Sequence, residues 1–558
     1  MSSGIAEERP TGEQEKKSTE VAKEDLSNST SSSEQYDDDQ TVYPKGKALA
    51  LIMLAIYLAV FLVALDRTII ATAIPRITDD FHSLGDTGWY GSAYLLAQCA
   101  SQLLFGRIYT FYSPKWVFLI TIGLFELGSA LCGAAPNSVA FIVGRAFAGL
   151  GNSGIFSGAI VIMVYIVPLS KRSIYQGLIG AIYGIASVMG PLLGGVFTDR
   201  VTWRWCFYIN LPIGALTVLI IVLILKLPNQ KISGNSLRQK FLQLDPLGNI
   251  FLLPCIVCLL LALEWGGSTY AWKDGRIIAL LVISGVLAII FIAVQCWKQE
   301  TATVPPRILK QRSMASGFCS AFCLGASMIV MIFYIPVWFQ AIMGVSAVES
   351  GIRNLPLMLS LVIASIAAGG ATAAIGYYAP FMILSTVLMS VGAGLLTTFQ
   401  SDTGVAKWIS YQILFGIGLG LGMQQPNLAA QTVLARQDVP VGASLMFFAQ
   451  ALGGAVFVSI AQTVFTNSLV SGLNKVSGLD PINVVNTGAT QIRNLVPAND
   501  LDVVLLAYNG ALTDAYKVAL ATACFSAVGA FTVEWRSVKG KKGVVEGQEK
   551  TTDEVKNS

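Results

Sequence analysis

The sequence contains few charged residues. Only 13% of its 558 residues are Asp, Glu, Lys or Arg, whereas a soluble domain carries roughly 25%. It has one histidine, and its formal net charge of +4 is too small to indicate a nucleic-acid partner. Hydrophobic residues make up 54% of the chain, and the mean hydropathy is +0.63. These proportions exclude an ordinary soluble domain and indicate a protein of the lipid bilayer.

Phosphate-binding and metal-binding motifs are also lacking. No G-x-x-x-x-G-K-[ST] loop occurs, so the sequence has no phosphate cradle of the kind that an ATP-driven pump requires. All nine cysteines fall in apolar stretches, where structural disulfides are not expected. Cys255 and Cys258 have metal-ligand spacing, but no second cysteine pair and no histidine lies near them. We therefore expect no metal and no cofactor, and an ion gradient or downhill flow as the driving force.

Long apolar runs recur along the chain. A helix that crosses the bilayer needs about 20 apolar residues, and the sequence predicts an all-α membrane protein with fourteen such helices. The predicted spans are 48–74, 89–109, 115–135, 139–165, 176–198, 206–226, 247–266, 276–297, 316–340, 354–375, 378–399, 407–427, 442–467 and 516–535.

The loops predict the orientation and the division of the chain. Segments on the side of the N-terminus carry about twice as many Lys and Arg residues as those on the other side, which predicts a multi-pass protein with both termini in the cytosol. The predicted parts are a disordered polar tail (1–46), a six-helix lobe (47–226), an inner loop with an inserted helix pair and the loop that follows (227–315), a second six-helix lobe (316–535) with a long outer loop (468–515), and a cytosolic tail (536–558).

Four charged residues lie inside predicted spans. Asp66 and Arg67 interrupt an apolar run in the first span, Glu126 lies near the middle of the third, and Arg145 lies in the fourth at a depth similar to that of Asp66. Charges in hydrocarbon are expensive and persist mostly where they face a bundle interior or an ion path. We expect these residues to act in proton coupling or gating, with Asp66 and Arg145 paired if their helices adjoin. The alternative is a structural ion pair and a hydrogen-bonded Glu126.

Uncharged polar side chains also occur in the spans. Backbone hydrogen bonding inside each helix is complete, so these side chains need a cavity or a partner. We expect some of them to line a substrate path, with aromatic side chains as its apolar wall; simple core packing is the alternative. The tentative cavity residues are Gln98, Gln340, Gln424, Gln425 and Phe447.

Several motifs resemble those of one family. Residues 65–76 (LDRTIIATAIPR), 142–155 (IVGRAFAGLGNSGI) and 202–216 (TWRWCFYINLPIGAL) are similar to the first-span, fourth-span and sixth-span patterns of major facilitator superfamily transporters, in the fourteen-span branch of drug:proton antiporters common in fungi. Residues 186–195 (ASVMGPLLGG) resemble the antiporter motif G-x-x-x-G-P-x-x-G-G, with Ala186 at the first glycine. The matching residues of this motif are Gly190, Pro191, Gly194 and Gly195.

One motif departs from the family pattern. The loop between the second and third spans normally reads G-x-x-x-D-x-x-G-R-K, and here residues 106–115 read GRIYTFYSPK. Gly106 and Lys115 match, whereas Thr110 replaces the acid and Ser113 the second glycine. A gate that the acid would hold must therefore use other groups in this chain.

The resemblance, which covers roughly residues 47–540, implies a fold and an activity. The implied fold has two six-helix lobes plus an inserted helix pair, and the motif at Gly190 implies a bent, closely packed helix at the interface of the lobes. The implied activity is proton-coupled export of amphipathic small molecules such as toxins, secondary metabolites or antifungal drugs, across the plasma membrane or the vacuolar membrane. Its partners would be protons, the solute and lipid, with no obligate protein partner. The alternatives are a transporter of a nutrient, such as a basic amino acid or an iron chelate, and a membrane receptor without transport.

Overall fold

Long helices follow the predicted apolar runs. The structure is a computed structural model that describes residues 43–83, 86–227, 243–267, 269–474 and 498–539. The helices of the first part are α2 (Lys47–Phe81), α3 (Thr87–Phe111), α4 (Pro114–Gly133), α5 (Ser138–Ile166), α6 (Leu169–Arg200), α7 (Trp205–Tyr208), α8 (Asn210–Ile224), α10 (Pro246–Trp265) and α11 (Gly275–Lys298). The later helices are η2 (Gln299–Thr301), α12 (Pro306–Leu309), α13 (Arg312–Ala341), α14 (Ala347–Arg353), α15 (Leu355–Ile375), α16 (Ala379–Leu396), α17 (Val405–Gly422), α18 (Gln425–Val433), α19 (Val439–Leu473) and α22 (Ala498–Thr532).

Thirteen helices in the described part of the chain are long and apolar enough to cross a membrane. Helix α3 is not among them, although it occupies the position of the predicted second span and has 25 residues. Its sequence is less apolar because Gln98, Ser101 and Gln102 lie on it, and all three are buried in the protein. The polar side chains that lower its hydropathy therefore point inward, away from the surface.

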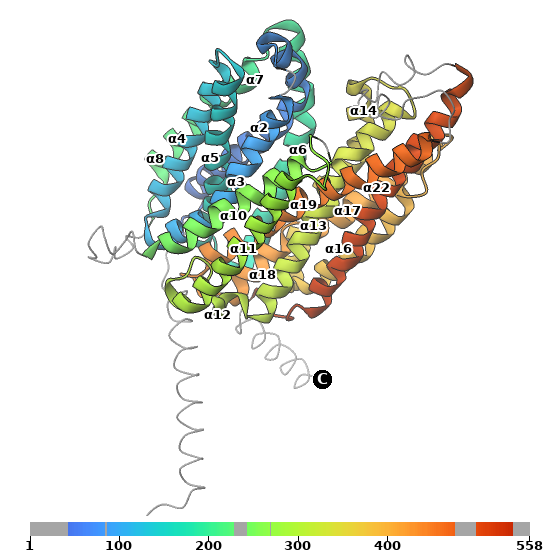
Figure 1. The fold of residues 1–558 in the computed structure, drawn as a ribbon. Coiled ribbons are helices and arrows are strands. Elements are labelled where there is room, and N and C mark those ends of the chain that lie inside the picture. Colours follow the sequence, from blue (N-terminus) through green and yellow to red (C-terminus); the bar gives the residue numbers. More distant parts are fainter. Residues whose placement is uncertain (1–42, 84–85, 228–242, 268, 475–497, 540–558) are drawn as a thin grey trace, which may run out of the picture. The chain divides into compact units, whose positions relative to one another are not determined.

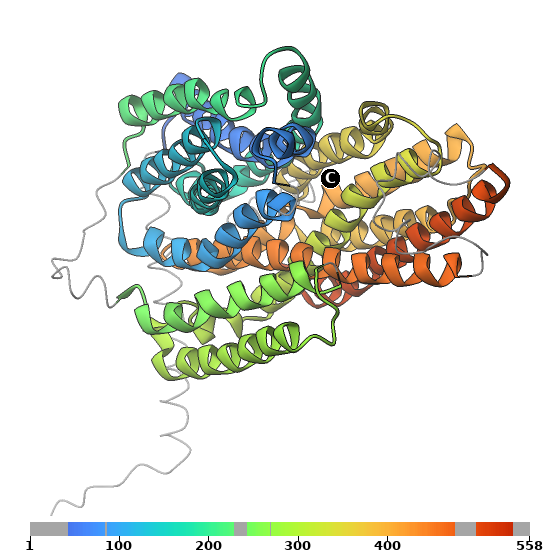
Figure 2. The same cartoon turned by 45° about the horizontal axis from the view of Figure 1, so that its top comes forward.

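The helices form two lobes and an inserted pair (Figures 1 and 2). Helices α2 to α8 pack on one another, and α13 to α22 do the same. The lobes meet where α6 packs against α15 and where α3 and α5 pack against α19. Helix α10 contacts both α3 and α19, so the inserted pair α10–α11 lies along the seam between the lobes.

The recorded contacts between the lobes gather toward one end. We call it the basic end, because Lys115, Lys171 and Arg307 lie there in the first turns of α4, α6 and α12. The two direct hydrogen bonds between described residues of the lobes both lie in this half of the bundle. Ser365 Oγ donates to the Gly177 carbonyl at 3.0 Å, and the hydroxyls of Ser157 and Ser444 are 3.0 Å apart.

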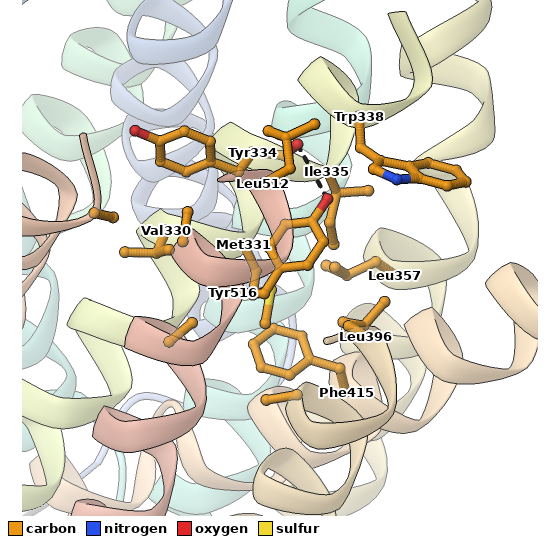
Figure 3. Packing of buried hydrophobic residues seen from close by; sticks show 14 of the residues in the cluster. Val330, Met331, Tyr334, Ile335, Trp338, Leu357, Leu396, Phe415, Leu512 and Tyr516 are labelled. Carbon is orange, nitrogen blue, oxygen red and sulfur yellow. Dashed lines mark hydrogen bonds between the residues drawn. The ribbon is translucent and has the colours of Figure 1, made fainter. Parts of the chain in front are cut away.

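Bulky side chains fill the second lobe. Figure 3 shows Tyr334 and Trp338 of α13 among residues from α15, α16, α17 and α22. The Tyr516 hydroxyl donates to the Tyr334 carbonyl at 3.3 Å, and Trp338 Nε1 donates to Asn509 Oδ1 at 2.7 Å. Both polar tips are thus satisfied inside an otherwise apolar cluster, as buried Tyr and Trp require.

The predicted loop 468–515 is wrong at both of its bounds. Helix α19 continues to Leu473, and the 35-residue helix α22 already begins at Ala498. A hydrogen bond joins these parts of α19 and α22, since Ser468 Oγ donates to Asp514 Oδ2 at 2.6 Å. The predicted polar tail lies largely outside the described residues, as do most of the loop after 227 and the end of the chain.

Helix α6, which carries the antiporter motif, lies at the interface of the lobes as predicted, but its motif glycines do not face the other lobe. Gly190 and Gly194 lie against Thr68 and Thr72 of α2, which belongs to the same lobe, and nothing lies near the position of a side chain at Gly195. Helix α6 runs between α2 and α15, and each residue turns the helix by about 100°. The glycines that meet the other lobe are therefore on another face, at Gly177, Gly180 and Gly184.

This packing predicts different effects of two substitutions in one motif. Gly190→Leu should lower the free energy of unfolding by about 1–3 kcal/mol, the usual range for overpacking, because its side chain would enter the α2–α6 contact. Gly195→Leu should leave stability nearly unchanged. Thermal unfolding of both variants in lipid nanodiscs measures the difference, and equal Tm values would contradict the described α2–α6 contact.

Candidate functional site

A buried ion pair joins the first and fourth predicted spans. Arg145 Nη1 on α5 lies 2.6 Å from Asp66 Oδ2 on α2, and the two side chains are 1% and 0% exposed. Glycines bring α5 close to the neighbouring helices α3 and α4, since Gly149 lies directly against the Tyr94 carbonyl of α3 and Gly128 of α4 lies against the backbone of α5 at Ala148. The structure thus brings together two charges that are 79 positions apart in the sequence.

Further groups surround this pair. Arg145 Nε donates to the Tyr90 carbonyl at 2.9 Å, and the guanidinium carbon lies 4.5 Å from the centre of the Tyr94 ring. Asn210 Nδ2 lies 3.4 Å from Asp66 Oδ1 and 3.0 Å from Ser129 Oγ, and donates to both. Buried charges are tolerated when they are paired and hydrogen-bonded. The cluster of Asp66, Arg145, Asn210 and Ser129 meets that condition, and we call it the charge cluster.

Glu126 lies one helical turn before Ser129 on α4. It is half-buried, it lies against Gly214 of α8, and neither of its carboxylate oxygens has a hydrogen-bond partner among the described residues. A carboxyl group in this position can gain or lose a proton without breaking a hydrogen bond within the described protein. Of the four charges predicted from the sequence, Glu126 is therefore the one whose surroundings leave its protonation state open to change.

A small cavity lies between the lobes. Its lining comes from both of them: Arg67, Gln98, Phe156, Ile179, Tyr183, Met328, Ile329, Met423, Gln424, Phe447, Gln450 and Ala451. The space measures about 50 Å³, enough for only a few waters at roughly 10–15 Å³ each on the same measure. A larger solute can enter only after the lobes separate.

The structure distributes the predicted cavity residues over three places. Gln98, Gln424 and Phe447 line the central cavity together with Arg67. Gln425 lines a separate narrow space near the basic end, which Gln424 shares. Gln340 lines neither, because it lies near the far end of α13 and donates from Nε2 to Ser350 Oγ at 3.0 Å.

The altered motif at residues 106–115 lacks the acidic residue of the family pattern, and its residues make other contacts at the basic end. Thr110, at the acidic position of the motif, bonds only to the Gly106 carbonyl of its own helix, within the contacts recorded for described residues. Gly106 instead allows α3 to approach α19, because a side chain there would lie 2.8 Å from Ser444 Oγ. Lys115 Nζ donates to the carbonyls of Val222 and Leu225, at the last turn of α8.

The segment after the inserted pair bridges the two lobes at this end. Arg107 of α3 donates to the Glu300 carbonyl at 3.3 Å, and Arg307 donates to Glu300 Oε2 at 2.8 Å. Arg307 also binds Asp438, just before α19, through two hydrogen bonds of 2.7 and 2.8 Å. These bonds, chiefly those that Asp438 accepts, hold the pKa of the Arg307 guanidinium above its ordinary value.

Asp245 fixes this bridging segment to the start of α10. Its side chain is fully buried and accepts hydrogen bonds from Gln295, Lys298 and both the backbone and the hydroxyl of Thr303. Burial raises the pKa of the Asp245 carboxyl, but the hydrogen bonds outweigh burial and leave it below its ordinary value. The inserted pair is therefore anchored by an ionised carboxylate rather than by apolar contact alone.

The sequence did not indicate every residue of the charge cluster and of the cavity between the lobes. Asn210 lies within the motif at 202–216, but no pattern there indicated that its side chain reaches Asp66. The cavity residues Phe156, Tyr183 and Gln450 come from three different helices, and only the packing of the lobes brings them together. Asp66 and Arg67 are adjacent in the sequence, which did not indicate that they belong to different sites. Asp66 is part of the charge cluster, and Arg67 faces the cavity.

Two helix lobes, buried charges in one lobe and a cavity between the lobes are features of a membrane transporter. The family model described as Major Facilitator Superfamily matches residues 56–458, and the chain belongs to that family. Solved structures with the same fold include the human organic anion transporter MFSD10 (TETRAN), with a TM-score of 0.55, 13% identity and coverage of 85% of this chain and 100% of that one. The proton:xylose symporter XylE matches with a TM-score of 0.54, 13% identity and coverage of 86% and 94%.

Curated relatives are much more similar in sequence. The MFS-type efflux pump MFS1 of Arthroderma benhamiae is 57% identical over 509 residues, 91% of this chain and 95% of that protein. The rubrofusarin-specific efflux pump aurT of Gibberella zeae is 53% identical, with coverage of 91% and 93%. The efflux pump aflT of Aspergillus parasiticus is 52% identical, with coverage of 88% and 97%.

The geometry of the ion pair predicts a non-additive pair of substitutions. Arg145→Leu leaves Asp66 buried without its cation and should cost about 3–5 kcal/mol of stability. The double variant Asp66→Leu/Arg145→Leu removes both charges and should lose less than Arg145→Leu alone. Thermal unfolding in nanodiscs measures both losses.

A matched control is available on the surface of the same lobe. Arg204 pairs with Asp80 at 3.0 Å, but these side chains are 33% and 46% exposed. Arg204→Leu should therefore change stability by no more than about 1 kcal/mol. Additive losses in the buried double variant would show that Asp66 and Arg145 do not depend on each other.

Proposed function

We propose that the protein exports amphipathic small molecules, such as toxins, secondary metabolites or antifungal drugs, in exchange for protons. The observation that carries this proposal is a carboxyl group without a hydrogen-bond partner among the described residues, that of Glu126, beside the charge cluster of one lobe, together with a separate cavity between the lobes. Relatives that are 52–57% identical and cover nearly the whole chain are named efflux pumps, which supports export as the direction.

The charge cluster would couple proton movement to the motion of the lobes. In this proposal Glu126 carries the proton, and the Asp66–Arg145 pair holds α2 against α5 while Glu126 is in one protonation state. Release of the proton would change the charge near the pair and thereby bias the position of α2. Helix α2 is well placed for this role, because it packs on α6, and α6 packs on α15 of the other lobe.

We further propose that the basic end faces the cytosol and that both termini lie there. The excess of Lys and Arg on this side supports the assignment. The described conformer would then be closed toward the cytosol, held by the Ser365–Gly177 contact and by the bridge from Arg107 to Asp438. Together with the thirteen apolar helices, α3 would bring the number of spans to fourteen, with the two lobes at 47–226 and 316–535. The protein would lie in the plasma membrane, with the vacuolar membrane as the alternative.

Nutrient transport is the second candidate, and the cavity argues against a cationic solute. Its described lining contains Arg67 and no Asp or Glu. A basic amino acid would have to approach this positive charge without a carboxylate to compensate it. Neutral or negatively charged solutes meet no such barrier.

The proton role of Glu126 predicts a specific loss. Glu126→Gln removes the titration while keeping size and polarity, so it should abolish efflux driven by a pH difference while leaving membrane insertion intact. Arg145→Ala should have the same effect on efflux. The measurement is solute flux in sealed proteoliposomes under an imposed pH gradient, beside the amount of inserted protein.

Glu349→Gln is the matched control for this prediction. Glu349 lies on α14 with 44% of its side chain exposed and pairs with Arg353 within the same helix. Its replacement should leave gradient-driven flux unchanged. Wild-type flux from Glu126→Gln would remove Glu126 from the coupling mechanism.

The contact between the lobes predicts a second transport defect. A side chain at Gly177 would lie 2.6 Å from the Ser365 carbonyl of α15, so Gly177→Leu should prevent the lobes from closing at the basic end. Flux should fall by at least about 10-fold, while insertion and the stability of each lobe persist. Gly195→Leu on the same helix is the control, and normal flux from Gly177→Leu would contradict the role of this contact.

A further inference from the structure

The central cavity contains a positive charge without a negative partner. Arg67 lies near the middle of α2 and is half-buried. None of the ion pairs recorded among the described residues includes it, and the described lining of the cavity has no Asp or Glu. A cation in a membrane interior is expensive unless something compensates it, so this site favours the arrival of negative charge.

Asp66 does not provide that compensation, although it precedes Arg67 in the sequence. Its carboxylate is fully buried, binds Arg145 at 2.6 Å and accepts a hydrogen bond from Asn210. Neighbouring residues on a helix point about 100° apart. Asp66 therefore faces the interior of its own lobe, while Arg67 faces the space between the lobes.

The rest of the lining indicates the shape of a suitable solute. The ring centres of Phe156 and Phe447, which belong to different lobes, are 5.3 Å apart, and those of Phe156 and Tyr183 are 6.5 Å apart, so aromatic side chains from both lobes line the cavity. Gln98 and Gln424 are buried, and each has an Oε1 atom without a hydrogen-bond partner among the described residues. Aromatic walls favour a flat ring system, and free amide oxygens accept hydrogen bonds from hydroxyl groups.

We propose that this cavity, once the lobes separate, binds planar aromatic solutes that carry a negatively charged oxygen, a carboxylate or an ionised phenol. Arg67 supplies the counter-charge, Phe156 and Phe447 contact the ring faces, and Gln98 and Gln424 accept hydrogen bonds from ring hydroxyls. The proposal rests on the proposed export function, because it names the class of solute that the exporter carries. It also assigns Arg67 to solute binding, apart from the proton-coupling residues with which the sequence pattern groups it.

The test compares two probes of the same shape and different charge. Anthracene-2-carboxylate is an anion at pH 7.5, and anthracene-2-carboxamide is its neutral counterpart. Binding of each to the full-length protein in lipid nanodiscs is measured by equilibrium dialysis without a pH gradient, and empty nanodiscs provide the correction for partition into lipid. The wild-type protein should bind the carboxylate about 10-fold more tightly than the amide, since a charged pair adds to the shared ring contacts.

Variants of Arg67 locate the effect. Arg67→Gln should weaken carboxylate binding by about 10-fold and leave amide binding unchanged, whereas Arg67→Lys should keep most of the preference for the anion. Arg76→Gln, at an exposed position of the same helix, is the matched control and should bind both probes as the wild type does. Thermal unfolding of each variant establishes that it is folded.

Three results would overturn the proposal. They are equal binding of the two probes by the wild type, equal loss of both in Arg67→Gln, and no binding of the carboxylate at all. Failure of the export proposal gives a different pattern. In that case the anion preference and its dependence on Arg67 remain in the dialysis experiment, while proteoliposomes show no flux under a pH gradient.

Discussion

The burial of Asp66 against Arg145 constrains the whole first lobe. Each charge alone would be very costly in this interior, so α2 and α5 must remain in register for the pair to form. The glycines of α4 and α5 permit the required helix contacts, and Asn210 connects the pair to α8 and α4. The lobe therefore behaves as a unit whose internal geometry is set by one polar contact, and its motion relative to the second lobe is the remaining freedom.

Helix α6 connects this rigid lobe to the other one. One face of α6 rests on α2 through Gly190 and Gly194, and another meets α15 through Gly177, Gly180 and Gly184. Small residues allow close helix contact, but such contact is easily separated because few side chains interlock. Beyond Gly184 the helix leaves large apolar side chains exposed, such as Val196 at 51%. The glycine contacts between α6 and α15 therefore lie toward the basic end, and α6 also contacts α14 at the other end.

The sequence predicted the helices, the family and the charges well, because each depends on local pattern. Apolar length marks a span wherever it lies, and the cost of a buried charge makes Asp66, Glu126 and Arg145 conspicuous. The sequence pattern could not indicate in which direction each side chain points from its helix. It placed Gly190 at the interface of the lobes and Gln340 in the cavity, whereas packing turns both elsewhere. Asn210 and the bridge through Arg307 require contacts between distant segments, which only the folded chain defines.

The separation of Asp66 from Arg67 has a consequence for exchange transport. A proton site and a solute site that shared one carboxylate would compete directly for it. Here the acids lie within one lobe, and the cavity has a cation, so solute and proton need not meet. In the proposed mechanism, coupling would pass through α2, which carries both Asp66 and Arg67 on different faces. A small rotation or shift of this helix would alter the ion pair and the cavity together, and that shared helix is the shortest physical connection between proton and solute.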